Sequence, residues 1–413
     1  MVGAGIAGLA AAATLSRAGV RVSIVEARDR IGGRVCTRRD PRLDAAIELG
    51  AEFVHGKPVE LLSLLERAET PVRAIEGAWY WEGESGLEPL HFQKALKPVL
   101  DPLQKQAEPD RPFLEFLREL RPAPDPRASA LALGYVEGFH AADPACAGTV
   151  GLAQQEKASA SEGGELPRRV PDGLDRFVET MRGAATLHLQ TVVREVRWRR
   201  GEVTLESTTP GGAVVRPRRA RRAVITLPLG VLQAGSVHFT PEVRHVQEAV
   251  SRLAMGAVLK VVLLLREPLW EGAFALSRRR HFPTWWTLAP AKEPALVGWA
   301  AGPAAARLTG LPADTLVKAA VQEVSGLLRL APARLQASLL GTHVADWGAD
   351  PYARGAYSWE PVGAGKARAE LAVPAEGTLF FAGEAVNAGG TAGTLQAALA
   401  SGRRAAKEVL ATL

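Results

Sequence analysis

The segments Gly3-Ala4-Gly5-Ile6-Ala7-Gly8 and Val22-Ser23-Ile24-Val25-Glu26 decide the fold that this sequence predicts. In the pattern G-x-G-x-x-G the glycines lack a Cβ, so the backbone can turn tightly and approach a pyrophosphate whose charge lies at a helix N-terminus. Glu26 ends a short apolar strand about 20 residues later, where an acidic side chain accepts hydrogen bonds from a ribose. The two segments therefore predict a βαβ unit that binds a dinucleotide.

A second glycine pair follows in Ile31-Gly32-Gly33-Arg34-Val35, where an arginine can face the same phosphates. This extension is more typical of a flavin site than of a nicotinamide site. Near the other end of the chain, Leu379-Phe380-Phe381-Ala382-Gly383-Glu384 has the form of a second half of the same site. We therefore expect one dinucleotide to contact both ends of the chain.

The start of the sequence departs from this pattern. Only two residues precede Gly3, so either the first parallel strand is short or the start is truncated or misassigned. The apolar run from Ile6 to Ala13 could also belong to a signal peptide. No Lys or Arg precedes that run, and Arg17 and Arg21 follow it closely, so we expect a helix of the βαβ unit instead.

The composition is that of an ordinary globular protein, with 413 residues of which 47% are hydrophobic and 23% charged. This length exceeds the size at which single cores usually stop growing, so two domains are expected. No apolar run approaches about 18 residues without a charge, which argues against a transmembrane helix. Cys36 and Cys146 are too few for a disulfide framework, and the 8 histidines form no ligand pairs. We expect a cytoplasmic protein without a metal centre.

The formal net charge is +6, and arginines are concentrated in residues 216–222. A nucleic-acid site would need aromatic residues between the arginines or a groove-reading motif, and neither is present. Strand-like patterns flank the segment on both sides, so we interpret it as a solvated turn between strands.

The remaining chain alternates between structural types. Residues 78–166 carry many prolines between short helical runs such as Phe113 to Leu117, which favours a helical cap over a sheet. A helix is expected to start at Pro171, strands to occupy residues 187–227, a strand to run from Val258 to Leu265, and a helix from Pro312 to Leu330.

Motifs along nearly the whole chain resemble those of the flavin-containing amine oxidases, the family of monoamine oxidases, polyamine oxidases and histone-lysine demethylases. In family order they are the glycine loop with Glu26 to Arg34, Leu49 to Gly56, Val224 to Leu232, Gly256 to Lys260, Trp347 to Tyr357, and Gly383 to Leu399. The resemblance implies an α/β fold, with a Rossmann-like FAD domain of the glutathione-reductase type and an inserted α+β substrate domain. It implies FAD-binding residues 1–77, 167–235 and 341–413, and substrate-binding residues 78–166 and 236–340.

The resemblance also implies a noncovalent FAD and assigns residues to it. The expected contacts are Gly3, Gly5, Gly8, Glu26, Arg28, Gly33 and Arg34 with the adenosine and pyrophosphate, Gly50, Ala51 and Trp347 near the flavin, Val193 with the adenine, and Gly383 and Glu384 at the ribityl end. Thr394 and Leu395 would present backbone N–H groups to the isoalloxazine edge, where a helix dipole stabilises negative charge. Ala356 stands where mitochondrial monoamine oxidases attach their flavin through cysteine.

Three positions carry the catalytic expectations that follow from the resemblance. In the family, a lysine at the place of Lys260 reaches flavin N5 through a water and assists reoxidation or imine hydrolysis. Tyr357 occupies the first of two places for aromatic residues that frame substrate access, and Thr394 occupies the second. His55 stands near the expected substrate entrance, where a neutral imidazole could accept a hydrogen bond from an ammonium.

The sequence therefore predicts an FAD-dependent oxidation of a small amine. Hydride transfer from the carbon next to nitrogen to flavin N5 gives an imine, which hydrolyses, and O2 is reduced to hydrogen peroxide. No nucleic-acid or membrane partner is expected, and the amine and the oligomeric state stay open. An L-amino-acid oxidase is a close alternative that needs a cation for the substrate carboxylate, such as Arg278, Arg279 or Arg280. An FAD-dependent desaturase and a non-catalytic flavin-binding protein also stay open.

Overall fold

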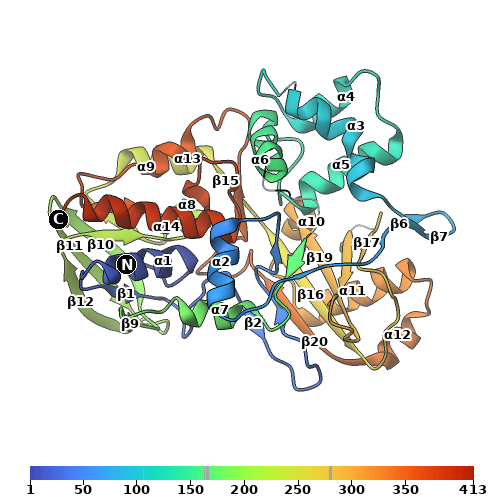
Figure 1. Cartoon of the computed structure of the whole chain (residues 1–413), viewed down its shortest axis with the longest axis horizontal. Coiled ribbons are helices and arrows are strands. Elements are labelled where there is room, and N and C mark those ends of the chain that lie inside the picture. The colour runs from blue at the N-terminus through green and yellow to red at the C-terminus, as the bar shows by residue number, and fades with distance from the viewer. Residues whose placement is uncertain (106, 162, 164–166, 279–280) are drawn as a thin grey trace.

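A parallel sheet forms the end of the molecule that contains both chain termini (Figure 1). The computed structural model describes residues 1–105, 107–161, 163, 167–278 and 281–413. Strand β1 (Ser23–Val25) pairs with β9 (Thr186–His188), and β13 (Ala223–Ile225) pairs with β22 (Leu379–Phe381), all in parallel. Val2 joins the two pairs through bridges to Val25 and Ile225. In this structure the first strand is represented by Val2 alone.

Two helices cover one face of this sheet. Helix α1 (Ile6–Arg17) and helix α14 (Leu395–Leu410) share a core with Ile24, Val224 and Phe380 of the strands. They approach closely, because a Cβ at Gly402 of α14 would lie 2.2 Å from the carbonyl oxygen of Ala7. The packing brings the N-terminal and C-terminal segments together and confirms that Ile6 to Ala13 begin a helix.

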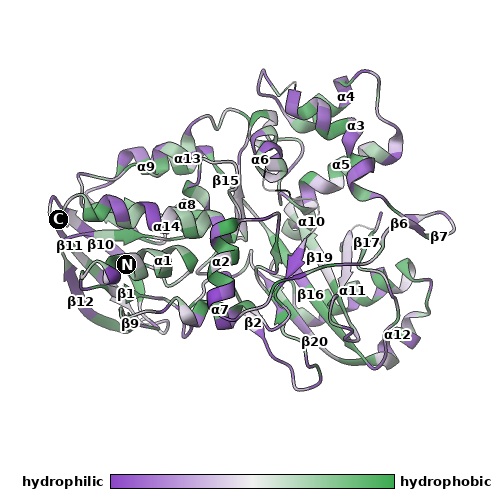
Figure 2. Ribbon diagram, viewed as in Figure 1, coloured by the Kyte–Doolittle hydropathy of each residue, from purple (hydrophilic) through white to green (hydrophobic). Residues whose placement is uncertain are grey.

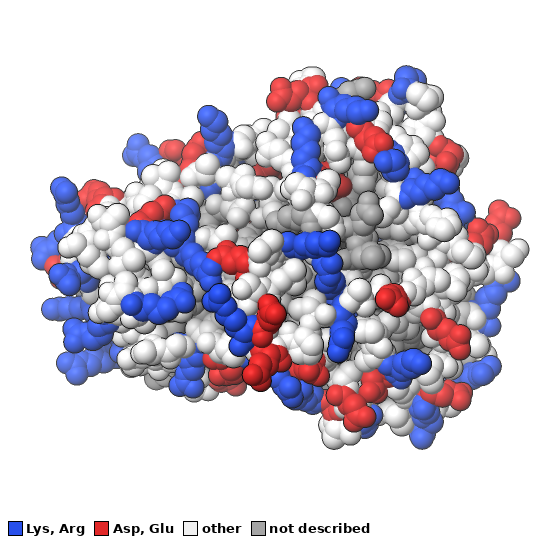
Figure 3. Space-filling model, viewed as in Figure 1, with Lys and Arg blue, Asp and Glu red and all other residues white. Residues whose placement is uncertain are grey.

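A second sheet has the strand order β12-β11-β10-β14. Its strands are β10 (Val192–Arg199), β11 (Glu202–Thr208), β12 (Val214–Ala220) and β14 (His238–Thr240). The prediction of a solvated turn at residues 216–222 was wrong, because most of that segment is the exposed edge strand β12. Arginines and Pro217 suit such an edge, since charge and a missing N–H discourage further strand pairing. Figure 3 shows the resulting gathering of Lys and Arg at this end of the molecule.

The largest sheet has seven strands in the order β20-β16-β19-β18-β17-β6-β7. Its strands are β6 (Trp79–Gly83), β7 (Gly86–Pro89), β16 (Val258–Leu265), β17 (Phe274–Leu276), β18 (Thr284–Thr287), β19 (Ala295–Ala301) and β20 (Leu339–Asp346). Strand β16 has the predicted bounds, and every residue in it is buried. Figure 2 shows this strand as mostly hydrophobic. Helix α11 (Ala313–Leu327) packs on this sheet and begins directly after Pro312.

The proline-rich segment contributes both strands and helices. Helices α3 (Phe92–Lys105), α4 (Phe113–Glu119), α5 (Pro126–Gly138) and α6 (Thr149–Ser161) form the helical group at the upper right of Figure 1. Strands β6 and β7 precede them and extend the seven-stranded sheet, so the prediction that residues 78–166 form a cap without a sheet was wrong for residues 79–89. Hydrogen bonds to β17, far away in the sequence, hold β6 in place.

The domain boundaries stay a prediction, and some elements pair or pack with elements on the far side of them. Strand β14 pairs with β10, although it follows residue 236. Helix α9 (Arg244–Arg252) also follows residue 236, and it packs in one core with Val25 and Ile225 of the parallel sheet. Strand β20 pairs with β16 although most of it follows residue 341.

The remaining elements are short. They are β2 (Thr37–Arg38), β3 (Ile47–Glu48), β4 (Phe53–Val54), α2 (Val59–Arg67), β5 (Arg73–Ala74), β8 (Arg168–Arg169), α7 (Leu174–Thr180), α8 (Leu229–Gln233), β15 (Ala254–Gly256), α10 (Gly302–Ala306), α12 (Pro332–Ser338), β21 (Tyr357–Trp359), α13 (Ala367–Leu371) and η1 (Glu384–Val386). Across the described residues, none of the helices combines the length and apolarity needed to cross a bilayer. The same residues contain no group of three or more His, Cys, Asp or Glu side chains that could hold a metal ion.

The close approach of α1 and α14 gives a stability prediction. Gly402→Ala inserts a methyl group against the Ala7 carbonyl and should destabilise the fold by about 1–3 kcal/mol. Gly134→Ala is the matched control, because a Cβ at this helical glycine of α5 meets no atom within 4 Å and should add about 0.5–1 kcal/mol of stability. Urea unfolding of the two variants measures both effects. Equal stability of Gly402→Ala and the parent protein would contradict the packing.

Candidate active site

A large cavity lies between the parallel sheet and the seven-stranded sheet. Its volume is about 1790 Å³, and it is lined by segments from both ends of the chain. The predicted site residues that line it are Gly3, Gly5, Glu26, Arg28, Gly33, Arg34, Gly50, Ala51, His55, Val193, Lys260, Trp347, Tyr357, Gly383, Glu384, Thr394 and Leu395. Side chains and backbone predicted to share one ligand therefore do share one cavity.

Gly8 is the predicted cofactor residue that lies outside this cavity wall. A Cβ at Gly8 would lie 2.1 Å from the carbonyl oxygen of Gly3, so this glycine allows α1 to pack against the preceding loop. Gly5, the N-cap residue of α1, does line the cavity, and no side chain caps this helix end or places an acid in its first turn. The exposed N–H groups and the positive end of the helix dipole suit a pyrophosphate.

Glu26 is held at the end of β1 by backbone donors. Its carboxylate accepts hydrogen bonds from Ala4 N at 2.7 Å and from Arg28 N at 2.9 Å. The Arg28 guanidinium donates to Asp350 Oδ1 at 2.5 Å and lies 5.4 Å from the centre of the Tyr352 ring. The carboxylate is therefore fixed at the cavity wall, where it can accept hydrogen bonds from a ribose.

Val193 lies on the same side of the cavity. It belongs to β10, where its Cα partner on β11 is Ser207 and a bulge follows. Its place on the wall of the cavity is consistent with a backbone contact to an adenine.

Arg34 and Glu384 form an ion pair that joins the two ends of the chain. Arg34 Nη1 donates to Glu384 Oε1 at 2.9 Å and to the Ala356 carbonyl oxygen at 2.5 Å. The other Glu384 oxygen accepts from Ser358 Oγ at 2.7 Å and from Gly393 N at 3.1 Å. Burial opposes ionisation of Glu384, but the charges of Arg34 and Arg368 hold its pKa below the ordinary value. The two segments thus meet through side chains that bond directly, and contact of both with one dinucleotide stays a prediction.

Helix α14 points its N-terminus at the cavity. Thr394 is the N-cap residue, and its hydroxyl accepts from Ala397 N at 3.2 Å and donates to the Thr391 carbonyl oxygen at 2.6 Å. This hydroxyl is therefore occupied by the helix cap. What Thr394 and Leu395 offer to a ligand is their backbone at the positive end of the helix dipole.

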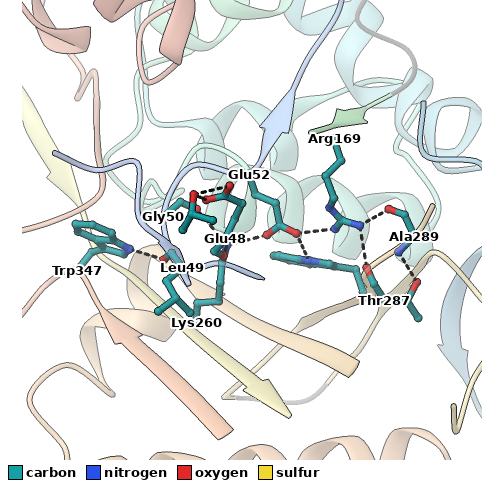
Figure 4. Close-up of polar contacts among 11 residues, drawn as sticks. Glu48, Leu49, Gly50, Glu52, Arg169, Lys260, Thr287, Ala289 and Trp347 are labelled. Atoms are coloured by element: carbon teal, nitrogen blue, oxygen red, sulfur yellow. Dashed lines mark hydrogen bonds and ion pairs between the residues drawn. The ribbon is translucent and has the colours of Figure 1, made fainter. Parts of the chain in front are cut away.

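Lys260 is buried in the cavity wall with all three ammonium protons directed at oxygens (Figure 4). Its Nζ donates to the carbonyl oxygens of Glu48 at 2.7 Å and Gly50 at 3.1 Å, and to Glu52 Oε2 at 2.8 Å. Trp286 and Trp299 lie on other sides of it, with their ring centres 5.6 Å and 5.5 Å from Nζ. The lysine is therefore an ion-paired charge in a fixed orientation, and not a solvent-facing lysine of an edge strand.

Glu52 connects Lys260 to a second cation. Its Oε1 accepts from Arg169 Nη2 at 2.6 Å and from Trp286 Nε1 at 3.1 Å. Burial raises the pKa of Glu52, but Lys260 and Arg169 outweigh that effect and hold it below the ordinary value. Glu52 lies within the motif from Leu49 to Gly56, but that motif does not indicate the pairing with Lys260, and nothing in the sequence around Arg169 indicates a role for that residue.

Trp347 packs beside this network. Its Nε1 donates to the Leu49 carbonyl oxygen at 2.9 Å, directly before Gly50 and Ala51 in the chain. The indole therefore braces the loop whose carbonyl groups hold Lys260 (Figure 4). Of the other tryptophans, Trp285 is fully buried in the core.

Tyr357 and His55 both line the cavity, and both contact Phe139. The Tyr357 hydroxyl donates to the Phe139 carbonyl oxygen at 2.9 Å, and the His55 ring meets the Phe139 ring edge-on at a centroid distance of 5.1 Å. Burial raises the pKa of Tyr357 and lowers the pKa of His55 to about 4. Both side chains are therefore uncharged near neutral pH.

One of the arginines considered for a substrate carboxylate reaches the same cavity. Arg278 is exposed and lines it, whereas Arg279 and Arg280 lie outside the described residues.

Comparison with known proteins agrees with this geometry. The family described as flavin containing amine oxidoreductase matches residues 6–410. Lysine-specific histone demethylase 1 homolog 1 of Arabidopsis thaliana is 28% identical over 448 residues, covering 99% of this chain and 52% of the relative. Putrescine oxidase of Kocuria rosea is 29% identical over 415 residues, covering 87% of this chain and 83% of the relative.

A solved structure of a wild-type putrescine oxidase bound to putrescine has the same fold, with a TM-score of 0.81 and 21% identity over 99% of this chain and 98% of that one. The chain spans about half the length of the demethylases that it matches. The family match extends over nearly all of the chain, and it includes Lys260 and both partners of the Arg34 and Glu384 pair, whereas Gly3 and Gly5 precede it. The chain belongs to the family of flavin-containing amine oxidoreductases.

Proposed function

We propose that this protein is an FAD-dependent amine oxidase that oxidises a small amine at the carbon next to nitrogen. In the overall reaction R–CH2–NH–R′ and O2 give an imine and H2O2, and water then converts the imine to an aldehyde and the amine R′–NH2. When bound, the flavin supplies the two-electron acceptor that links the amine to O2. The observation that carries the proposal is the position of Lys260, a buried cation in the wall of the cavity that the dinucleotide-binding residues also line.

The residues of the nucleotide side suit FAD held without a covalent bond. The uncapped end of α1 and Arg34 provide positive charge for the pyrophosphate, and Glu26 is fixed where it can accept from a ribose. Ala356 lines the cavity and carries no nucleophile that could attach a flavin. The N-terminus of α14 would place positive potential at the opposite end of the cofactor.

Lys260 and the uncharged His55 have different proposed roles on the substrate side, Lys260 in the reaction with O2 and His55 in binding the substrate. Glu52 and two backbone carbonyls orient the Lys260 ammonium, and this fixed positive charge would stabilise negative charge that develops on O2. His55, with its pKa lowered to about 4, offers a neutral imidazole as acceptor for a substrate N–H. The Tyr357 ring is fixed by its hydrogen bond to Phe139 and forms part of the wall along which an amine would approach.

The first experiment is the visible spectrum of the purified protein under anaerobic conditions, before and after adding primary amines, polyamines and amino acids in turn. A flavin spectrum that is bleached by an amine supports the proposal. Bleaching by an amino acid but not by its decarboxylated amine would favour the amino-acid oxidase, with Arg278 as a candidate for the carboxylate. Flavin that no amine bleaches would contradict amine oxidation.

Substitution of Lys260 tests its role. Lys260→Met should stay folded, because Arg169 and Trp286 still bond the Glu52 carboxylate, while reoxidation of the reduced enzyme by O2 should slow by about 10- to 1000-fold. Stopped-flow mixing with O2 measures this rate. Lys318→Met, at an exposed position of α11 away from the cavity, is the matched control and should keep the parental rate. Unchanged reduction and reoxidation in Lys260→Met would remove the proposed role.

The lowered pKa of His55 predicts a pH dependence of stability. Between pH 6.5 and about 4 the unfolded chain binds a proton at this histidine and the folded protein does not, so the contribution of His55 to stability falls as the pH falls through this window. Thermal unfolding at pH 7 and pH 5 should show a smaller loss of melting temperature in His55→Asn than in the parent protein. An equal loss in both proteins would show that His55 is not held in its neutral form.

A further inference from the structure

Seven aromatic side chains line the substrate side of the cavity and contact one another in a closed series. They are Phe53, His55, Trp79, Phe92, Tyr135, Phe139 and Phe274, called here the aromatic circuit. They come from segments far apart in the sequence, namely β4 and the residue that follows it, β6, α3, α5 with its C-cap, and β17. Such a surface favours apolar and aromatic ligands, because ring faces and edges pack at defined distances and bury a large area.

One half of the aromatic circuit is stacked. The Trp79 ring lies parallel to Phe92 at a centroid distance of 4.6 Å and to Phe274 at 4.2 Å. Phe274 continues to Phe53 at 5.8 Å. These rings are held by strand pairing of β6 with β17, where Trp79 and Phe274 are direct partners.

The other half closes the series. Tyr135 stacks on Phe139 at 5.0 Å and meets Phe92 at 6.0 Å. The His55 ring lies between the other two, with centroid distances of 5.1 Å to Phe139 and 6.1 Å to Phe53. The half is braced by hydrogen bonds, since the Tyr135 hydroxyl donates to Glu156 Oε1 at 2.8 Å and the Tyr357 hydroxyl donates to the Phe139 carbonyl oxygen.

The carboxylates that line the cavity, Glu137 apart, are bonded to other groups of the protein. Within the described residues these acids are Glu26, Glu52, Asp101, Glu137, Glu156 and Glu384. On the substrate side, Glu52 binds Lys260 and Arg169, Asp101 lies 3.4 Å from Lys97 Nζ, and Glu156 Oε1 binds the Tyr135 hydroxyl and lies 3.4 Å from His140 Nε2. Burial raises the pKa of Glu137, and the nearby charge of Arg307 opposes that shift. A second ammonium on a substrate would have to compete with these partners.

Cations add to this effect. Lys57, Lys94 and Arg278 are exposed and line the same cavity. Like charges repel one another, and water and salt screen part of that repulsion at these exposed positions. A ligand that carries a second positive charge away from its reacting nitrogen is therefore disfavoured, so repulsion would favour monoamines over diamines.

We propose that the substrate is a monoamine with an aromatic or cycloalkyl body, which the aromatic circuit binds, and that diamines and polyamines are poor substrates. The inference rests on the proposed function and specifies its substrate class. The ring of the substrate extends the stacked and edge-on contacts, while its single nitrogen reaches the side of the cavity that holds Lys260. Selectivity then has two sources, ring packing on the circuit and repulsion of a distal charge.

The decisive comparison uses the holoenzyme and amines matched in length. Hexylamine and 1,6-diaminohexane differ by the distal ammonium, and 2-phenylethylamine differs from hexylamine by its ring. Anaerobic flavin reduction, followed by stopped-flow over a range of amine concentrations, gives a rate and an apparent Kd for each. We expect 2-phenylethylamine to have the lowest Kd and the diamine to have a Kd at least about tenfold above that of hexylamine, a difference of about 1.4 kcal/mol.

Each outcome separates the inference from the proposed function. Reduction by 1,6-diaminohexane with a Kd equal to or below that of hexylamine would overturn the inference and leave amine oxidation standing, with Glu137 then the candidate for the distal ammonium. Reduction by none of the amines would overturn the proposed function itself.

A variant pair tests the aromatic circuit directly. Phe92→Leu removes a ring that stacks on Trp79, and it should lower the preference for 2-phenylethylamine over hexylamine by about two- to tenfold through Kd. Phe239→Leu, on β14 outside the cavity wall and similarly half-buried, is the matched control and should keep the parental preference. An unchanged preference in Phe92→Leu would overturn the role of the circuit, and if this variant fails to fold, the amine series on the parent protein still decides the substrate class.

Discussion

The buried carboxylate of Glu52 is the interaction on which the arrangement of the cavity depends. One of its oxygens binds Lys260 on β16, and the other binds Arg169 on β8 and the indole of Trp286 on β18. A charge removed from water is tolerated only where partners satisfy it, and here each partner comes from a different strand. The loop between β3 and β4 is thereby fixed against the seven-stranded sheet, and this fixes where the Lys260 ammonium stands.

The same network explains why Lys260 can be buried at all. An ammonium has three protons to donate, and the structure supplies three acceptors, of which one carries a full negative charge. Arg169 in turn balances the second oxygen of that carboxylate. The three side chains carry one net positive charge at the cavity wall, and this charge favours negative charge on a bound group nearby.

Local motifs could be predicted from the sequence because their chemistry and their geometry lie in adjacent residues. The glycine loop, the acid at Glu26, strand β16 and the start of α11 after Pro312 are of this kind. The pairing of Glu52 with Lys260 and Arg169 could not be predicted, because it depends on how β16, β8 and the loop between β3 and β4 are arranged in space, and that arrangement has no local signature. The aromatic circuit could not be predicted from the sequence for the same reason, because Trp79 and Phe274 become partners only when β6 pairs with β17.

The two mispredicted segments show how tertiary context decides between similar local patterns. The arginine-rich segment lacks the alternation of a half-buried strand, and it becomes a strand because β11 offers an unpaired edge that β12 can extend without burying either face. Residues 79–83 carry three aromatic side chains that would be costly on the surface of a helical cap. Pairing with β17 places Trp79 against Phe274, so that the Trp79 ring is packed in the wall of the cavity and is not left on the surface. The pairing that corrects the fold prediction is therefore also the pairing that gives the cavity its aromatic character.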